Sequence, residues 1–394
     1  MRNFHRTLIA SSITALTITS PLSVQAQSMD NLIKSSSLDL NFRIRAESVD
    51  IDNGTTDSAL ANTLKSRATF KSGDMYGLSL LIEGDSTLHI SDEFYDKDGK
   101  NDDNYDLVLD QETTQLNQAY IQYNNFSSVI KAGNQRINLD NQRHVGGVAF
   151  RQDEATFDAI SISNKSIDDI RVFLAIANNR NSITNANTEE DIVLLNVKYA
   201  LSKSAAISGY FYDIKDTNGI ADLDFATFGV RAAGKLESSI TFEAELASQE
   251  KSTGTADFTS LYYNISVGTA IAGVTTKLGY EAFGSDDGEA AFATPLGTNH
   301  KFFGWSDIYL TGAGNNGIQD LNLSAVTKVS GVKLVAQFHK FDALEGGDDL
   351  GTEFGFMAAK KFGTYSASVK VAQLSDSDTK NDTTKLWLTG TAKF

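Results

Sequence analysis

Cations near the start of the chain are the first residues whose type and spacing suggest a function, the binding of anions. Arg43 and Arg45 alternate with apolar residues within the stretch 35–54, and Lys65 and Arg67 repeat this arrangement in the next apolar stretch. A guanidinium group can form two parallel hydrogen bonds with one carboxylate, so arginines spaced by two residues suit the binding of an acidic solute. Such cations need an element with one charged face and one apolar face.

Strict alternation of apolar and polar residues predicts that these cations lie on β-strands. Side chains of a strand point alternately to its two faces, so the charges of 35–54 share one face and the large apolar residues share the other. About eighteen such segments (16–18) follow one another along the chain, and examples are 170–176, 240–246 and 365–371. The fold class is therefore predicted to be all-β.

The connections between the segments favour a transmembrane antiparallel up-and-down β-barrel over a soluble sandwich. Short turns alternate with longer connections rich in Asp, Asn and Gly, at 91–112, 135–153, 179–190, 284–317, 343–350 and 375–383. Short periplasmic turns and long extracellular loops are typical of bacterial outer-membrane barrels, whose apolar face contacts lipid and whose polar face lines a lumen. The last segment ends on Phe394, and a terminal aromatic residue is typical of this class of protein.

The N-terminal residues predict export from the cytoplasm. Two arginines precede a mildly apolar run, and the sequence VQA at 24–26 supplies small residues at the spacing of a cleavage site. Residues 1–26 are therefore predicted to be a cleaved signal peptide, and 27–394 a single barrel domain in the bacterial outer membrane. No later apolar run is long enough for a membrane helix, so strands must cross the membrane.

Charge is distributed unevenly along the chain. The formal net charge of −16 argues against a nucleic-acid partner. The acidic residues gather in loops, and 91–112 alone holds nine acids against two lysines. Alternation instead assigns twelve cations to the lumen: Arg43, Arg45, Lys65, Arg67, Lys131, Arg171, Arg231, Lys277, Lys328, Lys333, Lys370 and Lys385. Rings of Arg and Lys make anion-selective pores, so we predict passive diffusion of anionic solutes, with a general nonspecific porin as the alternative.

The acidic loop is also a candidate for binding Ca²⁺. Asp96, Asp98 and Asp102 place carboxylates densely, but the glycine between them does not have the offset of an EF-hand loop. A solvated loop at the cell surface is the alternative interpretation. We expect no cofactor and no other metal site.

Catalysis and a purely structural barrel are the two other classes of function. None of the five histidines lies in the His-Glu-x-x-His pattern of zinc proteases, and no G-x-S-x-G elbow occurs. A barrel of about eighteen strands leaves an aqueous channel unless it is plugged, and no plug domain precedes the first strand. We therefore predict that the protein is a channel and not an enzyme.

Two stretches resemble segments of a known family. AGNQRINLDNQRHVGGVAFRQDEATFDAI, 132–160, and FATPLGTNHKFFGWSDIYL, 292–310, look like parts of the alginate-export family of outer-membrane barrels, in particular its shorter porin-like members in γ-proteobacteria. The resemblance implies an eighteen-stranded barrel with an arginine-rich constriction and outward passage of an acidic polysaccharide. On this resemblance, Arg136, Arg143 and Arg151 become further candidates for the selectivity zone.

Both stretches have a second interpretation. Loop 135–153 could fold inward and brace the barrel rather than select solutes, and its Gly146-Gly147 pair would permit a tight bend. Phe303 and Trp305 are candidates for stacking on a sugar ring, with an aromatic girdle or a loop core as the alternative. The expected partners are outer-membrane lipid, lipopolysaccharide and an anionic or saccharide solute. The oligomeric state stays open, because porins often form trimers whereas the resemblance implies a monomer.

Overall fold

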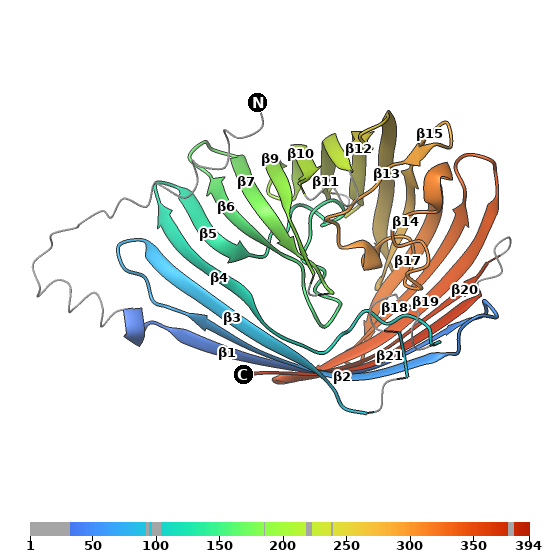
Figure 1. The fold of residues 1–394 in the computed structure, drawn as a ribbon, viewed down its shortest axis with the longest axis horizontal. Helices are drawn as coiled ribbons and strands as arrows, with labels where there is room; N and C mark the ends of the chain where they lie inside the picture. Colours follow the sequence, from blue (N-terminus) through green and yellow to red (C-terminus); the bar gives the residue numbers. More distant parts are fainter. Residues whose placement is uncertain are drawn as a thin grey trace, which may run out of the picture.

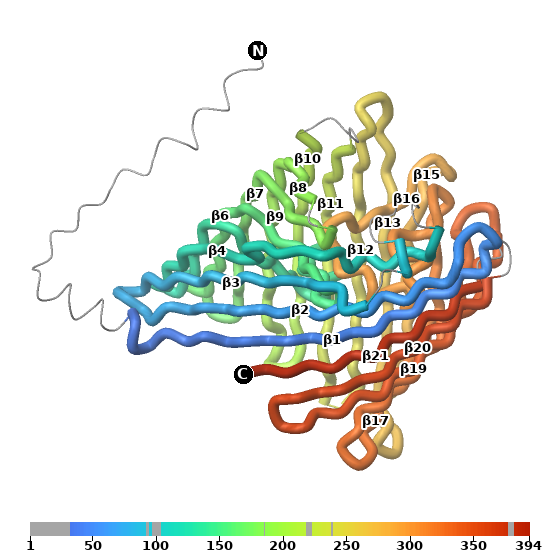
Figure 2. Tube along the Cα trace, turned by 60° about the horizontal axis from the view of Figure 1, so that its bottom comes forward, coloured from blue at the N-terminus to red at the C-terminus, as the bar shows by residue number. Residues whose placement is uncertain are grey.

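A computed structural model describes residues 32–91, 94–96, 104–184, 186–217, 223–237, 239–376 and 382–394. In this part of the chain, eighteen long strands form one antiparallel sheet that curves round on itself (Figures 1 and 2). In chain order they are β1 (Ser37–Ile51), β2 (Ala59–Lys71), β3 (Leu78–His89), β4 (Thr113–Asn125), β5 (Ser128–Gln135), β6 (Thr156–Asn164), β7 (Ile170–Asn181), β9 (Glu190–Ser202), β10 (Ala205–Asp216), β11 (Asp224–Lys235), β12 (Thr241–Ser252), β13 (Asp257–Ile271), β14 (Val274–Phe283), β17 (Ile318–Val329), β18 (Val332–Asp342), β19 (Asp349–Phe362), β20 (Tyr365–Ser375) and β21 (Thr383–Lys393).

The first and last strands pair with each other and close the barrel. Asn41 of β1 lies opposite Arg67 of β2 on one side and opposite Lys393 of β21 on the other. All neighbouring long strands are antiparallel. A closed sheet satisfies its backbone groups internally and has no free edge, as strands that cross a membrane require. The predicted fold class and the strand number are confirmed.

The two rims of the barrel differ in the length of their connections. On one rim, which also carries the start of β1 and the end of β21, the strands are joined by turns of two to six residues. On the other rim, the longest loops are 90–112, 136–155 and 284–317. Short turns face the periplasm and long loops face the exterior in outer-membrane barrels, as the sequence predicted.

Side chains alternate between an apolar outer face and a charged inner face. Ile44, Leu246 and Leu388 are 50%, 55% and 51% exposed on the outside, whereas the adjacent Arg45 and Glu245 are 4% and 5% exposed. A charge that faces lipid near the middle of the bilayer costs about 2–4 kcal/mol, which explains this separation. The described residues include no helix that is both long enough and apolar enough to cross a membrane.

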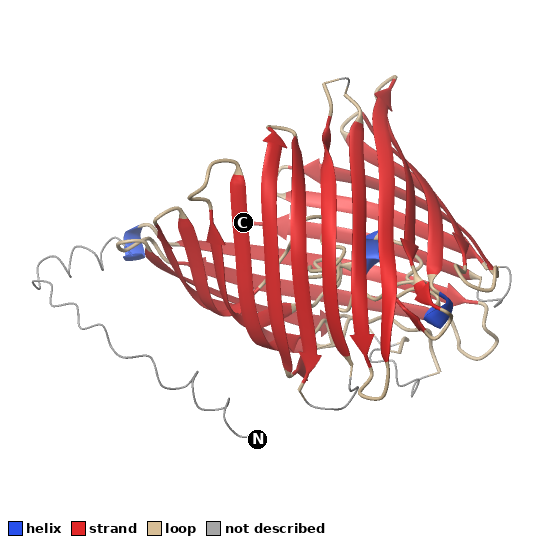
Figure 3. Ribbon diagram, turned by 90° about the horizontal axis from the view of Figure 1, so that it is seen from above, coloured by secondary structure: helices blue, strands red, loops and turns tan. Residues whose placement is uncertain are grey.

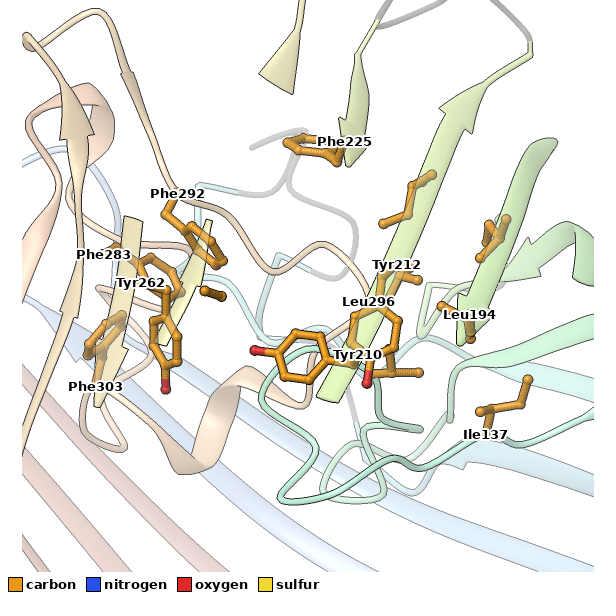
Figure 4. Packing of buried hydrophobic residues seen from close by; sticks show 14 of the residues in the cluster. Ile137, Leu194, Tyr210, Tyr212, Phe225, Tyr262, Phe283, Phe292, Leu296 and Phe303 are labelled. Carbon is orange, nitrogen blue, oxygen red and sulfur yellow. The ribbon is translucent and has the colours of Figure 1, made fainter. Parts of the chain in front are cut away.

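Loops 136–155 and 284–317 fold into the barrel, and we call them together the partition (Figures 1 and 3). Figure 4 shows aromatic side chains of 284–317 packed against the inner wall. The ring of Phe292 lies 5.5 Å from that of Tyr262, and Phe303 lies 4.9 Å from Phe283. The largest apolar cluster therefore lies inside the lumen. The remaining elements are short: β8 (Asn187–Thr188), β15 (Ser285–Asp286), β16 (Ala290–Ala291), η1 (Asn299–Lys301) and η2 (Gly314–Asn316).

Candidate functional site

The two loops of the partition bind each other through their backbones. The N–H of Gly146 donates to the carbonyl of Leu296 at 2.8 Å, and the N–H of Thr298 donates to the carbonyl of Gln142 at 2.9 Å. A Cβ atom on Gly146 would lie 2.2 Å from Oγ1 of Thr298, so this close approach requires glycine. The partition is therefore one connected unit inside the lumen.

The predicted arginines of β1 hold the partition against the wall. Arg43 donates from Nη1 to the carbonyl of Ala149 at 2.9 Å and from Nε to Oε1 of Gln152 at 2.8 Å. Arg45 donates from Nη2 to the carbonyl of Phe150 at 2.8 Å, and its side chain is buried. Their donors are directed at the protein itself, so in this structure both arginines position a loop.

A second group of predicted cations forms an ion-pair cluster between the wall and the partition. Arg67 donates to Asp85 at 3.2 Å and to Glu154 at 2.8 Å. The ammonium of Lys65 lies 3.4 Å from Asp85, and the guanidinium of Arg136 pairs with Glu154. These three cations are thus engaged by carboxylates of the protein, which anchors loop 136–155 to β2 and β3.

Arg151 links both loops of the partition to the wall. It donates from Nη1 to Oε1 of Glu47 in β1 at 3.1 Å, and from Nη2 to Oδ2 of Asp307 at 3.2 Å. The three side chains are at most 8% exposed. Burial alone would lower the pKa of Arg151, but the carboxylates around it, Glu47 above all, raise that pKa above its usual value. The guanidinium is therefore a permanent positive charge between the partition and the wall.

Arg143 is fully buried and makes no contact with an open part of the lumen. Its Nε atom lies 2.7 Å from Oε1 of Glu281. Its guanidinium carbon lies 4.4–4.5 Å from the ring centroids of Phe283, Phe302 and Phe303, a geometry that stabilises a cation over aromatic faces. Arg143 therefore has the surroundings of a structural anchor between the two loops and β14.

The two predicted sugar-stacking residues are covered by protein. Phe303 is 1% exposed and belongs to the aromatic cage around Arg143. Trp305 has the ammonium of Lys370 at 4.2 Å from its ring, and its backbone N–H donates to the carboxylate of Glu353. This placement corresponds to the loop-core alternative rather than to a free platform for a sugar.

Some predictions fall on residues outside the described ranges. These are the signal peptide 1–26 and two of the three Ca²⁺ candidates, Asp98 and Asp102, whereas Asp96 is described and buried. Within the described ranges, no group of three or more His, Asp or Glu side chains could hold a metal ion.

Asp153 makes the docking of loop 136–155 sensitive to pH. Burial and the nearby Asp85 raise the pKa of Asp153 to about 6, against a hydrogen bond from Thr113 that lowers it. An undocked loop would have the ordinary pKa of about 4, so the docked state holds the proton more tightly. Docking should therefore gain stability as the pH falls from about 6 to about 4, and the Asp153→Asn variant should lose this gain.

Hydrogen exchange of the backbone amides of 136–155, followed in both proteins between pH 4 and 7, tests this expectation. The pH profile of the wild type must be compared with that of Asp153→Asn, because His300 changes the stability of docking with pH in the opposite direction to Asp153. Burial lowers the pKa of His300 to about 4, so its contribution to docking is lost as the pH falls below about 6.5. Equal pH profiles of protection in wild type and Asp153→Asn would contradict the prediction.

Cations without acidic partners lie elsewhere, in a cavity of about 720 Å³ on the short-turn side of the partition. We call it the basic cavity. It is formed by the inner face of β4 to β7 and β9 and by the first residues of loop 136–155. Its lining includes five cations and one acid: Lys131, Arg136, Lys165, Arg171, Lys198 and Asp140.

Three of these cations have no carboxylate within 4.0 Å among the described residues. Lys131 lies over the ring of Tyr120 at 4.5 Å, and Arg171 donates to the hydroxyl of Ser163 at 3.1 Å. Lys165 lies in the turn between β6 and β7. Side-chain amides such as that of Asn124 and hydroxyls such as that of Ser163 complete the lining. The arrangement can attract an anion and offer hydrogen bonds to it.

The sequence predicted some of the residues that line this cavity. The alternation assigned Lys131 and Arg171 to the lumen, and both line the basic cavity. Lys198 was missed, although it alternates with apolar residues of β9 in the same way. Lys165 was missed because it lies in a turn, where alternation gives no information about direction.

Comparison with known proteins identifies the family. The family model described as alginate export matches residues 35–375. Among solved structures, the chain is similar to Pseudomonas aeruginosa OccK3 (OpdO), with 12% identity, a TM-score of 0.71, and coverage of 94% of this chain and 99% of that chain. It is also similar to Acinetobacter baumannii OccAB4, with 10% identity, a TM-score of 0.71, and coverage of 92% and 99%. No curated protein matches.

These structural likenesses show the fold, an outer-membrane barrel of porin type. The family match extends over most of the chain and includes both stretches on which the resemblance was based. It agrees with the expectation that the protein is a channel rather than an enzyme. The chain belongs to the alginate export family.

Proposed function

We propose that this barrel is a diffusion channel that prefers anionic solutes, and that the basic cavity is its anion-binding region. The observation that carries the proposal is the set of cations without acidic partners, Lys131, Lys165 and Arg171, in one cavity of about 720 Å³. Many of the other lumenal arginines are neutralised by carboxylates or hold loop carbonyls. Unpaired cations on a wet wall raise the local concentration of anions and repel cations.

The solute class that fits the basic cavity best is an acidic oligosaccharide. Its lining combines cations with side-chain amides, such as that of Asn138, and with the hydroxyls of Ser127 and Ser161. A uronic acid has one carboxylate and several hydroxyls per ring, so it would use both kinds of group. The match to the alginate export family supports the same class of solute. A general nonspecific porin is the alternative.

Removal of one unpaired cation should weaken anion preference. In a planar bilayer under a KCl gradient, we expect Arg171→Gln to lower the anion-to-cation permeability ratio by about twofold, as read from the reversal potential. Lys215→Gln is the matched control, because it also removes one positive charge but from a side chain that is 56% exposed and lies 3.5 Å from Asp213. An equal effect of both substitutions, or a cation-selective wild-type channel, would contradict the proposal.

Addition of oligouronates tests the solute class. We expect them to interrupt the current of the wild-type channel, with weaker interruption in Arg171→Gln, whereas neutral oligosaccharides of the same length should have little effect. Equal effects of acidic and neutral sugars would leave a general porin as the function.

A further inference from the structure

A second cavity, of about 330 Å³, lies on the long-loop side of the partition and differs from the basic cavity in its chemistry. We call it the outer chamber. Its walls come from the long-loop ends of β1, β7 and β21, from Leu107 and Leu109, and from the partition. Much of its surface is aliphatic, contributed by Leu107, Leu109, Ile183, Leu296, Ile308 and Leu310.

An aliphatic wall is unusual for this location. The interior of an outer-membrane channel is normally polar, because it is in contact with water. Leu107 is nevertheless 38% exposed, and it lines the chamber together with Leu310 of the partition. Exposed apolar surface that lines a concave site typically binds a ligand with an apolar part.

A sugar does not fit such a wall. A hydroxyl that loses water against an aliphatic side chain without gaining a hydrogen bond leaves its polar atoms unsatisfied, which opposes binding. An acidic oligosaccharide, the solute class proposed for the basic cavity, would therefore be disfavoured in the outer chamber. A hydrocarbon body has no such penalty.

A buried cation also lines the chamber, and its hydrogen-bond donors are available to a ligand. Lys385 of β21 is 5% exposed, and its ammonium lies 3.8 Å from Oδ2 of Asp307, which is too far for a hydrogen bond. That carboxylate is already shared, since it accepts hydrogen bonds from Arg151 and His300. The described residues supply no hydrogen-bond acceptor to the Lys385 ammonium. Its three donors are thus available to a second carboxylate.

We propose that the outer chamber binds a small amphipathic acid, with its carboxylate on Lys385 and its hydrocarbon body against Leu107 and Leu310. At about 30 Å³ for each small group in the liquid state, the volume admits roughly ten non-hydrogen atoms. This is about the size of a medium-chain fatty acid such as hexanoate or octanoate. The inference does not rest on anion preference in the basic cavity, which is on the other side of the partition.

Titration of the full-length channel in lipid nanodiscs tests the inference. The chain has two tryptophans, Trp305 and Trp387, and Trp387 lies two residues from Lys385 on the same face of β21, so intrinsic fluorescence reports on this region. The probes are hexanoate, hexanamide and glucuronate. We expect saturable binding of hexanoate at least tenfold tighter than that of hexanamide, and no saturable binding of glucuronate.

Three variants separate the roles of charge and wall. Lys385→Met should remove the preference for hexanoate over hexanamide, while Leu107→Asn should weaken both. Lys340→Met, at the same rim but outside the chamber, should leave both affinities unchanged. Unchanged hexanoate binding in Lys385→Met and in Leu107→Asn would overturn the inference, as would glucuronate binding as tight as that of hexanoate. Leu107 is a partly exposed loop residue, so its variant provides the test even where Lys385→Met does not fold.

Discussion

The Arg151→Ala variant should have a single-channel conductance several times that of the wild type. The substitution removes the cation that Glu47 and Asp307 share and leaves both carboxylates buried without it. Breaking a buried ion pair from one side costs about 3–5 kcal/mol, which is a factor of about a hundred or more in the ratio of docked to undocked loop. A loop that has left the wall narrows the lumen less, and conductance at fixed salt in a planar bilayer measures this directly.

A double variant distinguishes two causes of the higher conductance: the buried negative charge that loses its pairing with Arg151, and the loss of the contacts that the Arg151 side chain makes. Adding Glu47→Gln to Arg151→Ala removes one of the two buried carboxylates that lose their hydrogen bonds from Arg151. We expect its conductance to fall between those of wild type and Arg151→Ala. A wild-type conductance in Arg151→Ala would show that Arg151 does not hold the loop. Equal conductances of the single and double variants would show that the unpaired negative charge of Glu47 does not cause the higher conductance.

Substitution of Arg143 should weaken the contact that this residue makes between the partition and Glu281 of β14. Arg143→Met keeps an apolar side chain within the cage of Phe283, Phe302 and Phe303 but leaves Glu281 without its cation. The expected cost is again about 3–5 kcal/mol, because Glu281 is buried. Limited proteolysis of loop 284–317 in nanodiscs should therefore be faster by about a hundredfold or more, since cleavage follows the population of the opened loop.

The matched control replaces both members of the pair with uncharged side chains. Arg143→Met combined with Glu281→Gln removes both charges of this pair, and replacing a buried ion pair in this way is often close to neutral. We expect the double variant to regain most of the resistance to proteolysis. Cleavage of the double variant as fast as that of Arg143→Met would show that the arginine acts through its contacts with the rings and not through its pairing with Glu281.

The barrel itself was predictable from the sequence because its signal is local. The neighbours Ile44 and Arg45 point to opposite faces in any strand, and lipid enforces this alternation from β1 to β21. The lengths of the connections are also visible without a structure. These features gave the fold class, the number of strands and the sidedness of the loops.

The roles of the arginines were not predictable from the sequence. Alternation shows that a side chain lies on the inner face of the barrel, but it does not show which residues contact that side chain. The side chains of Arg43 and Gln152 bind each other across 109 positions of sequence, and those of Arg151 and Asp307 across 156. No local pattern contains such pairings. The sequence therefore placed Arg43 correctly on the inner face but gave no sign that a loop would occupy its donors.

The closing pair of strands implies an order for the assembly of this protein. Most pairs join strands that follow one another in the sequence, but β1 can pair with β21 only after the whole chain is present, since Asn41 lies opposite Lys393. Long-range pairing of this kind is slow, because a large loop of chain must close before any contact compensates for the lost entropy. Arg151 can reach Glu47 and Asp307 together only when distant strands have come close. The interior should therefore become ordered last, and an arrested intermediate should be a curved open sheet with two unpaired edges.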